Sequence, residues 1–166
     1  MKYYINVFLI YSILGYLLET TLKTFFIPSM NNGFLYGPWI PVYGFGCCFI
    51  IAIMRLVFNR IKVSRWLKIV LVFFISTCVL TLLEFIGGNL IELLTGKIFW
   101  SYSDMKFNFG HYISLEISLI WGIMSLVIIY VVKPVLDKLI KKIPSIITYL
   151  ALGIFIIDFV ITLISI

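Results

Sequence analysis

Five long apolar runs are the feature of this 166-residue sequence that most restricts its fold. They cover residues 3–22, 39–58, 67–94, 112–132 and 146–166. A helix needs about 20 largely apolar residues to cross the hydrocarbon core of a bilayer, and each run is of that order or longer. The sequence therefore predicts an all-α polytopic membrane protein. We expect five transmembrane helices in a single membrane domain spanning residues 1–166, with the first run retained rather than removed as a signal peptide.

Composition supports a membrane protein over a soluble one. Apolar residues make up 63% of the chain and charged residues only 12%, whereas soluble domains carry about a quarter charged residues. The net charge of +6 would suit nucleic acid, but the basic residues fall between the apolar runs. We therefore expect membrane lipids, and no nucleic acid, as partners. Cys47, Cys48 and Cys78 lie within apolar runs without Cys-x-x-Cys spacing, which predicts no disulfide and no metal site.

The basic residues also predict an orientation. Five helices place ten Lys and Arg residues on the side of the amino terminus and three on the other side. Because cytoplasmic loops carry the excess of Lys and Arg, the amino terminus is expected in the cytoplasm and the carboxyl terminus outside. The loops on the inner side show no motif that indicates chemistry. The unusual residues lie in the outer loops, 23–38 and 95–111.

Six of the seven acidic residues fall in the outer half of this arrangement. At 1.5 Å per helical residue, Glu84 and Asp158 lie within about 6 Å of the bilayer midplane. Glu19, Glu92 and Glu116 lie nearer the outer edge, and Asp104 lies in the outer loop. An ionisable group inside a membrane is a functional-site hypothesis by default, so we infer an acidic cavity open to the outside. The alternative for each acid is a protonated carboxyl that joins two helices.

Two helices show the acids on stripes of small or polar residues. Thr77, Thr81, Glu84, Gly88 and Glu92 recur at helical spacing and predict a seam against a neighbouring helix. Ser12, Gly15 and Glu19 form a similar stripe in the first helix, with Lys23 one turn further on as an ion-pair candidate. Glu116 points away from the serine stripe of its own helix, so it is a weaker candidate for a functional role than the other acids.

A short internal repeat is present. Gly15-Tyr16-Leu17-Leu18-Glu19 and Gly88-Asn89-Leu90-Ile91-Glu92 share the pattern Gly-x-Leu-x-Glu, and each precedes an outer loop with Asn-x-Gly. Two hairpins of equal orientation plus one extra helix would give a parallel repeat; chance similarity in a Leu- and Gly-rich chain is the alternative.

The first outer loop, residues 31–46, is too apolar for water and too rich in Gly and Pro for a plain helix. It predicts a partly re-entrant segment whose free amides bind a headgroup or a carboxylate, or else a tight entry turn. The second outer loop offers Trp100, Tyr102, Ser103, Asp104 and Asn108 as ligand donors and acceptors. His111 has no metal-ligand partner at suitable spacing, and no Gly-x-Ser-x-Gly or Walker A pattern occurs, so we expect neither metal nor cofactor.

These loop motifs resemble the CmpB-like family of bacterial membrane proteins, described as ABC-transporter type IV. The family pattern is Asn-Arg-Gly-Phe-Leu-x-Gly-Pro-x-x-Pro-Ile-Tyr-Gly-x-Gly, followed by Glu-Tyr-x-x-Gly-x-x-x-Glu, Trp-Asp-Tyr-Ser, Asn-x-x-Gly and Trp-Gly. The matching residues are Asn31, Gly33, Phe34, Leu35, Gly37, Pro38, Pro41, Tyr43, Gly44, Gly46, Glu84, Gly88, Glu92, Trp100, Tyr102, Ser103, Asn108, Trp121 and Gly122. Asn32, Phe85 and Ser101 replace an arginine, a tyrosine and an aspartate of the pattern, which predicts that an outer-loop ion pair is missing here.

Three functions remain open at this point. The first is a small permease-type subunit of the bacterial cell membrane that binds or translocates a small polar solute or cation, as a homo-oligomer or with partner membrane or ATPase subunits. The others are a non-catalytic lipid- or partner-binding scaffold and a membrane enzyme acting on lipid or envelope precursors at the outer face. The candidate ligand-binding residues are Glu19, Asn31, Gly33, Gly37, Tyr43, Glu84, Gly88, Glu92, Trp100, Tyr102, Ser103, Asp104, Asn108 and Asp158.

Overall fold

The helices follow the five apolar runs. The computed structural model describes residues 1–25, 33–60 and 62–165, without the side chain of Lys23. Its helices are α1 (Lys2–Phe25), α2 (Pro41–Arg60), α3 (Arg65–Thr95), α4 (Leu115–Val127), α5 (Lys133–Ile140) and α6 (Ser145–Ile164). A π-helical turn, η1 (Ile128–Val132), joins α4 to α5. With α4, η1 and α5 counted as one span, the described residues contain five helices long and apolar enough to cross a membrane.

The ends of α3 show how local sequence sets helix boundaries. Ser64 precedes the helix and its hydroxyl accepts a hydrogen bond from the amide of Leu67, which satisfies a donor that the first turn leaves free. Gly96 ends the helix at a φ of 67°, in the left-handed region that glycine adopts without strain. The 31 residues between them make a helix of about 46 Å, longer than the hydrocarbon core.

The fourth span is longer than the predicted 112–132. The π turn at Ile128–Val132 carries the helix on to Ile140, so Lys133 and Asp137 lie on a helix and not in a loop. Lys133 and Asp137 are one turn apart and form an ion pair, which offsets their charge on a helix end. The apolar run ended at residue 132 in the sequence because the composition becomes polar there, although the backbone remains helical.

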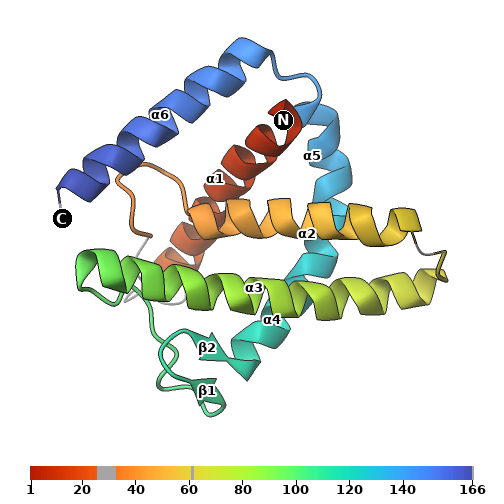
Figure 1. Cartoon of the computed structure of the whole chain (residues 1–166), viewed down its shortest axis with the longest axis horizontal. Coiled ribbons are helices and arrows are strands. Elements are labelled where there is room, and N and C mark those ends of the chain that lie inside the picture. Colours follow the sequence, from red (N-terminus) through yellow and green to blue (C-terminus); the bar gives the residue numbers. More distant parts are fainter. Residues whose placement is uncertain (26–32, 61, 166) are drawn as a thin grey trace.

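Packing is closest within two helical hairpins. α1 packs chiefly on α2, and α3 packs chiefly on α4, while α2 and α3 lie side by side and α6 contacts α1 (Figure 1). The loop 96–114 contains a short antiparallel ribbon, β1 (Asn108–Phe109) with β2 (Ile113–Ser114), which the sequence analysis did not predict. Residues 33–40 and 96–114 meet at one end of the bundle, where the rings of Phe34 and Phe99 are 5.5 Å apart. We call this end the loop face and the opposite end, with Tyr3, Arg55 and Lys133, the basic end.

Burial is distributed as a membrane requires. Fully buried side chains include Ser12, Ser76, Ser114, Ser125 and Thr148, whereas many of the exposed side chains are large and apolar. Small polar residues let helices approach closely and bond to one another, and apolar side chains face lipid. The chain is a multi-pass membrane protein.

The segment 33–40 is irregular and lies against helices. The amide of Ile40 donates to the carbonyl of Ser12, half-way along α1, at 3.0 Å. The amide of Gly37 donates to the carboxylate of Asp158 in α6, with its nitrogen 3.1 and 3.2 Å from the two oxygens. Irregular backbone is tolerated at membrane depth where protein covers it, and these contacts provide such cover.

Candidate functional site

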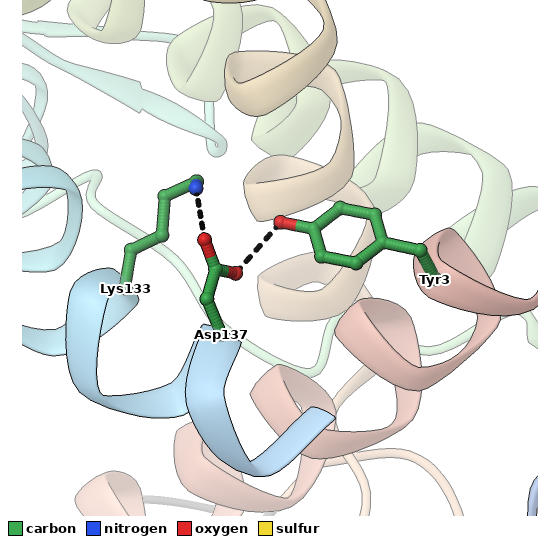
Figure 2. A network of polar contacts seen from close by, with 3 residues as sticks. All are labelled: Tyr3, Lys133 and Asp137. Atoms are coloured by element: carbon green, nitrogen blue, oxygen red, sulfur yellow. Dashed lines mark hydrogen bonds and ion pairs between the residues drawn. The ribbon is translucent and has the colours of Figure 1, made fainter. Parts of the chain in front are cut away.

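Three glutamates within the spans are bound by tyrosine hydroxyls, and Tyr3 donates in the same way to Asp137 at the basic end (Figure 2). Tyr43 donates to Glu19 at 3.0 Å, Tyr102 donates to Glu84 at 2.7 Å, and Tyr112 donates to Glu92 at 3.0 Å. A phenol is an uncharged donor, so each contact satisfies part of a carboxyl group without neutralising its charge.

The two Gly-x-Leu-x-Glu segments make the same contact. A Cβ atom at Gly15 would overlap the ring of Tyr43, and a Cβ atom at Gly88 would overlap the ring of Tyr112. Each tyrosine therefore packs on the glycine and bonds to the glutamate one turn further along the same helix. The first tyrosine lies in the first turn of α2, and the second lies shortly before α4. The short sequence repeat thus corresponds to a repeated three-residue arrangement, Gly–Tyr–Glu, in the two hairpins.

The stripes of α1 and α3 face the helices that follow them. A Cβ atom at Gly44 of α2 would overlap the Ser12 hydroxyl, and a Cβ atom at Gly122 of α4 would overlap that of Thr77. Thr81 donates to Ser118 of α4 at 2.7 Å. Both acidic stripes are therefore helix–helix seams, as the spacing indicates.

Four residues from different parts of the chain form one electrostatic cluster, which we call the acidic site: Glu19, Tyr43, Glu84 and Tyr102. Glu84 is 7% exposed and interacts electrostatically with Glu19. Tyr43 interacts with both glutamates and with Tyr102. Helices α1, α2 and α3 and the loop 96–114 therefore each contribute one member.

A small cavity lies beside the acidic site. It has a volume of about 30 Å³ and is lined by Tyr43, Cys47, Glu84, Trp121, Ser125 and Ile128, among others. The indole N–H of Trp121 is buried and interacts with the carboxylate of Glu84. Its ring packs edge-on against that of Tyr43, with centroids 5.4 Å apart. The walls of the cavity are almost wholly apolar, and its volume admits one or two water-sized groups.

The acidic site has no basic partner in the described part of the chain. The described residues contain an ion pair between Lys133 and Asp137, but it lies at the basic end, away from the acidic site. A buried carboxylate is costly without a compensating charge, and two that interact raise the cost. The side chain of Lys23, the ion-pair candidate for Glu19, lies outside the described residues.

The loop 96–114 holds Tyr102 over Glu84. The amide of Tyr102 donates to the carbonyl of His111 at 2.7 Å, and the side chain of Asn108 donates to the carbonyl of Ser103 at 2.7 Å. Burial, followed by the charge of Glu84 and the hydrogen bond to it, raises the pKa of the Tyr102 phenol well above its usual range. Tyr102 is thus a hydrogen-bond donor at any physiological pH.

Ser103 also contacts a histidine. Its hydroxyl lies 2.8 Å from Nδ1 of His111, and Ser101 lies 2.8 Å from Ser103. A hydrolytic centre needs a third group that orients the imidazole. Within residues 62–165 no carboxylate bonds to His111, and all three side chains are exposed. This contact closes the loop that carries Tyr102, and it does not assemble a nucleophile.

Glu92 lies apart from the acidic site. Its partner Tyr112 is buried, and the ring of Trp100 packs edge-on against Tyr112 with centroids 5.5 Å apart. Burial, then the hydrogen bond to Glu92, raises the pKa of Tyr112 to about 12. Glu92 itself is half-buried, so solvent at the loop face shares in its stabilisation.

Asp158 forms a structural clasp. Besides the Gly37 amide it accepts a hydrogen bond from the indole nitrogen of Trp39 at 3.1 Å. The prediction that amides of this segment bind a carboxylate is thus met by a carboxylate of the chain itself. These bonds join the segment 33–40 to α6 and leave Asp158 outside the acidic site.

The remaining candidates are dispersed. Gly33 has a φ of 76°, in the left-handed region, and Asp104 is exposed on the loop. Asn31 lies outside the described residues. Glu116 accepts hydrogen bonds from the Phe107 amide and the Ser114 hydroxyl, next to the ribbon. Within the described ranges, no three His, Cys, Asp or Glu side chains are placed to hold a metal ion.

Sequence reasoning missed two important residues. Tyr112 was not a candidate, although it follows Gly88 in the sequence at a separation similar to that between Gly15 and Tyr43. Trp121 appeared only within a Trp-Gly motif. The repeat was the signal that could have found Tyr112, because a second tyrosine is required to complete the second Gly–Tyr–Glu arrangement.

The fold and the site together define a polytopic α-helical membrane protein with a buried and a half-buried carboxylate, Glu84 and Glu19, each bound by a tyrosine. The sequence profile of the family described as "Putative ABC-transporter type IV" matches residues 6–165, and the chain belongs to this family. No curated protein and no solved structure gives a significant match. The protein is therefore a membrane protein of a transport-related family, in agreement with the resemblance seen in its loop motifs.

Proposed function

We propose that this chain is a permease-type subunit whose acidic site binds a small cation, or a small polar solute that carries a positive charge. The observation that carries the proposal is the burial of Glu84, which is 7% exposed and bound by the Tyr102 hydroxyl, without a basic partner in the described residues. Its charge requires compensation, and an exchangeable cation supplies it.

The surroundings favour a very small ligand. The cavity of about 30 Å³ beside Glu84 admits a few heavy atoms at most. The phenols of Tyr43 and Tyr102 already donate to the carboxylates, which leaves the remaining lone pairs to accept from a bound ammonium or hydrated ion. Methylammonium, with one charge and few heavy atoms, is a suitable probe.

We place the loop face outside the cell, with the amino terminus cytoplasmic. The excess of Lys and Arg at the basic end, ten against three, supports this orientation. A single set of five spans is small for a complete transporter, so we propose assembly with a second copy or with partner membrane and ATPase subunits. The family description supports an ATPase partner.

The direct experiment is thermal unfolding of the purified chain in detergent with increasing methylammonium, at ionic strength held constant with N-methylglucamine. Binding to the native state raises Tm by mass action. We expect a rise for the wild type, loss of the rise in Glu84→Gln, and retention in Glu116→Gln. Glu116 is the matched control because it lies outside the acidic site.

The scaffold function predicts a different outcome. If the carboxyls serve only to pack helices, Glu84→Gln shifts Tm by the same amount with and without methylammonium. A wild type that is insensitive to methylammonium, sodium and magnesium alike would refute the proposed site.

A further inference from the structure

We propose that the short ribbon in the loop 96–114 is a lipid-binding surface, and that its apolar side inserts among the phospholipids of the leaflet at the loop face. This inference goes beyond the proposed function, because it assigns a partner to a part of the chain outside the acidic site. It also gives a role to an element that the sequence analysis did not predict.

Three apolar residues share one side of the ribbon. Phe109 is paired with Ile113, and residues that lie opposite each other in an antiparallel pair have their side chains on the same side. Phe107 lies two residues before Phe109, and side chains two apart in a strand also share a side. The Leu115 amide donates to the Phe107 carbonyl at 3.0 Å, so the pairing continues past β1. We call Phe107, Phe109 and Ile113 the apolar side of the ribbon.

The other side of the ribbon is polar and bonds within the chain. It carries Asn108 and Ser114, which are paired. The Asn108 side chain donates to the carbonyl of Ser103 at 2.7 Å. The Ser114 hydroxyl donates to Glu116, and Ser114 is 1% exposed. The polar side is therefore the side that the protein uses for its own contacts.

The apolar side is left open. Phe107 is 56% exposed and Phe109 is 72% exposed. A two-sided antiparallel pair in water turns its apolar side to the core and its polar side to solvent, and this ribbon does the reverse. Exposed apolar surface of this kind marks a contact with another protein or with a membrane.

Lipid is the occupant that the surroundings favour. Figure 1 shows the ribbon at the start of α4. Leu115, Leu119 and Ile123 are exposed at successive turns of that helix, so a lipid-facing stripe begins beside Phe107. Ile113 also lines an open groove between α3 and α4, together with exposed apolar residues of α3. The apolar side of the ribbon is thus continuous with the surface of the spans that faces acyl chains.

The depth of the ribbon fits the edge of the hydrocarbon core. From Leu115 to Lys133, the first basic residue of the fourth span, the helix rises about 27 Å, close to the core thickness of about 30 Å. With Lys133 at one boundary, Leu115 and the ribbon lie at the other. The ammonium of Lys106 lies 5.4 Å from the centroid of the Phe107 ring. A lysine at this level keeps its stem on apolar surface and its charge among the phosphates.

Contact with lipid also steadies the loop that covers the acidic site. Asn108 of the ribbon bonds to the carbonyl of Ser103, the residue after Tyr102. The Tyr102 amide in turn donates to the carbonyl of His111, at the turn of the ribbon. Seating the ribbon in the leaflet therefore helps to hold the Tyr102 hydroxyl on Glu84, where the two oxygens are 2.7 Å apart.

The experiment is photocrosslinking of the full chain in vesicles of phosphatidylethanolamine and phosphatidylglycerol. The photoreactive residue p-benzoylphenylalanine replaces Phe109 or Phe107, and mass spectrometry identifies what each variant captures. Leu119, exposed on α4, is the lipid-facing reference, and Asp104, exposed on the same loop, is the control. We expect lipid adducts at Phe109 and Phe107 in yields comparable to Leu119 and several-fold above Asp104.

Two results would overturn the proposal. Capture of a second copy of the chain in place of lipid would assign the apolar side of the ribbon to a subunit interface. Lipid adducts at Phe109 and Phe107 no more frequent than at Asp104 would place the ribbon in water. The added ring extends outward from an exposed position, so both variants should keep the Tm of the wild type, and two positions guard against a local disturbance at one. Neither result bears on the cation site, because the methylammonium response of Tm tests Glu84 separately.

Discussion

The hairpins α1–α2 and α3–α4 contain the same arrangement and use it differently. Each packs a tyrosine on a glycine and bonds it to a glutamate one turn away. In the first hairpin the glutamate, Glu19, also interacts with Glu84 across the bundle. In the second, Glu92 is half-buried at the loop face and lies outside that cluster. The Gly–Tyr–Glu arrangement is therefore a means of joining helices, and a second carboxylate nearby turns it into a candidate binding site.

The largest expected effect tests whether the two arrangements are equivalent in packing. Gly15→Leu and Gly88→Leu each push a side chain into a tyrosine ring, and overpacking of this kind typically costs ~1–3 kcal/mol. Both should lower Tm of the purified protein by similar amounts. Gly87→Leu, next to Gly88 but with no neighbouring atom within 4 Å, is the control and should be tolerated. If Gly88→Leu were as harmless as Gly87→Leu, the second arrangement would not exist in solution.

A smaller effect should separate the two tyrosines. Tyr43→Phe removes the hydroxyl that donates to Glu19, which interacts with the buried acid Glu84. The net contribution of one hydrogen bond is typically about 0.5–1.5 kcal/mol, less than the cost of overpacking. Tyr112→Phe removes the donor to Glu92, which lies outside the acidic site, and should cost less. Chemical unfolding in mixed micelles measures both, and equal losses would contradict the effect of the second acid on which the comparison rests.

The smallest effect is an ionisation at high pH. Burial and the hydrogen bond to Glu92 raise the pKa of Tyr112 from 10.0 to about 12. A pKa raised by folding means that the contribution of Tyr112 to stability is complete below pH 10 and is lost as the pH rises through about 12. Absorbance titration of the folded protein at the tyrosinate band should show a component with a midpoint near pH 12 that Tyr112→Phe removes, whereas Tyr102 titrates at higher pH still. A component near pH 12 that persists in the variant would assign it to another tyrosine.

Sequence patterns predicted the helices well because membrane spanning imposes a length and a composition on each one. The stripes of Ser12, Gly15 and Glu19 and of Thr77, Glu84 and Gly88 also predicted which faces pack, since helical spacing is local information. The hydrogen-bond partners of the buried acids were harder to predict. Tyr102 reaches Glu84 because the loop closes through His111 and Asn108, and loop closure is not encoded in a periodic pattern.

The sequence was also misleading in one region. The polar residues after Val132 resemble a loop, whereas the π turn continues the helix and brings Asp137 to Tyr3. A change of hydrogen-bonding pattern inside a helix has no compositional signature.

The central claim is that Glu19 and Glu84 form one site whose charge is compensated by an exchangeable cation. Its most direct measurement is the release of protons when methylammonium is added to the purified protein in weakly buffered solution. We predict a release that saturates with methylammonium, persists in Glu92→Gln and disappears in Glu84→Gln. A wild type that releases no protons on binding, or a Glu84→Gln variant that releases as many, would contradict the account.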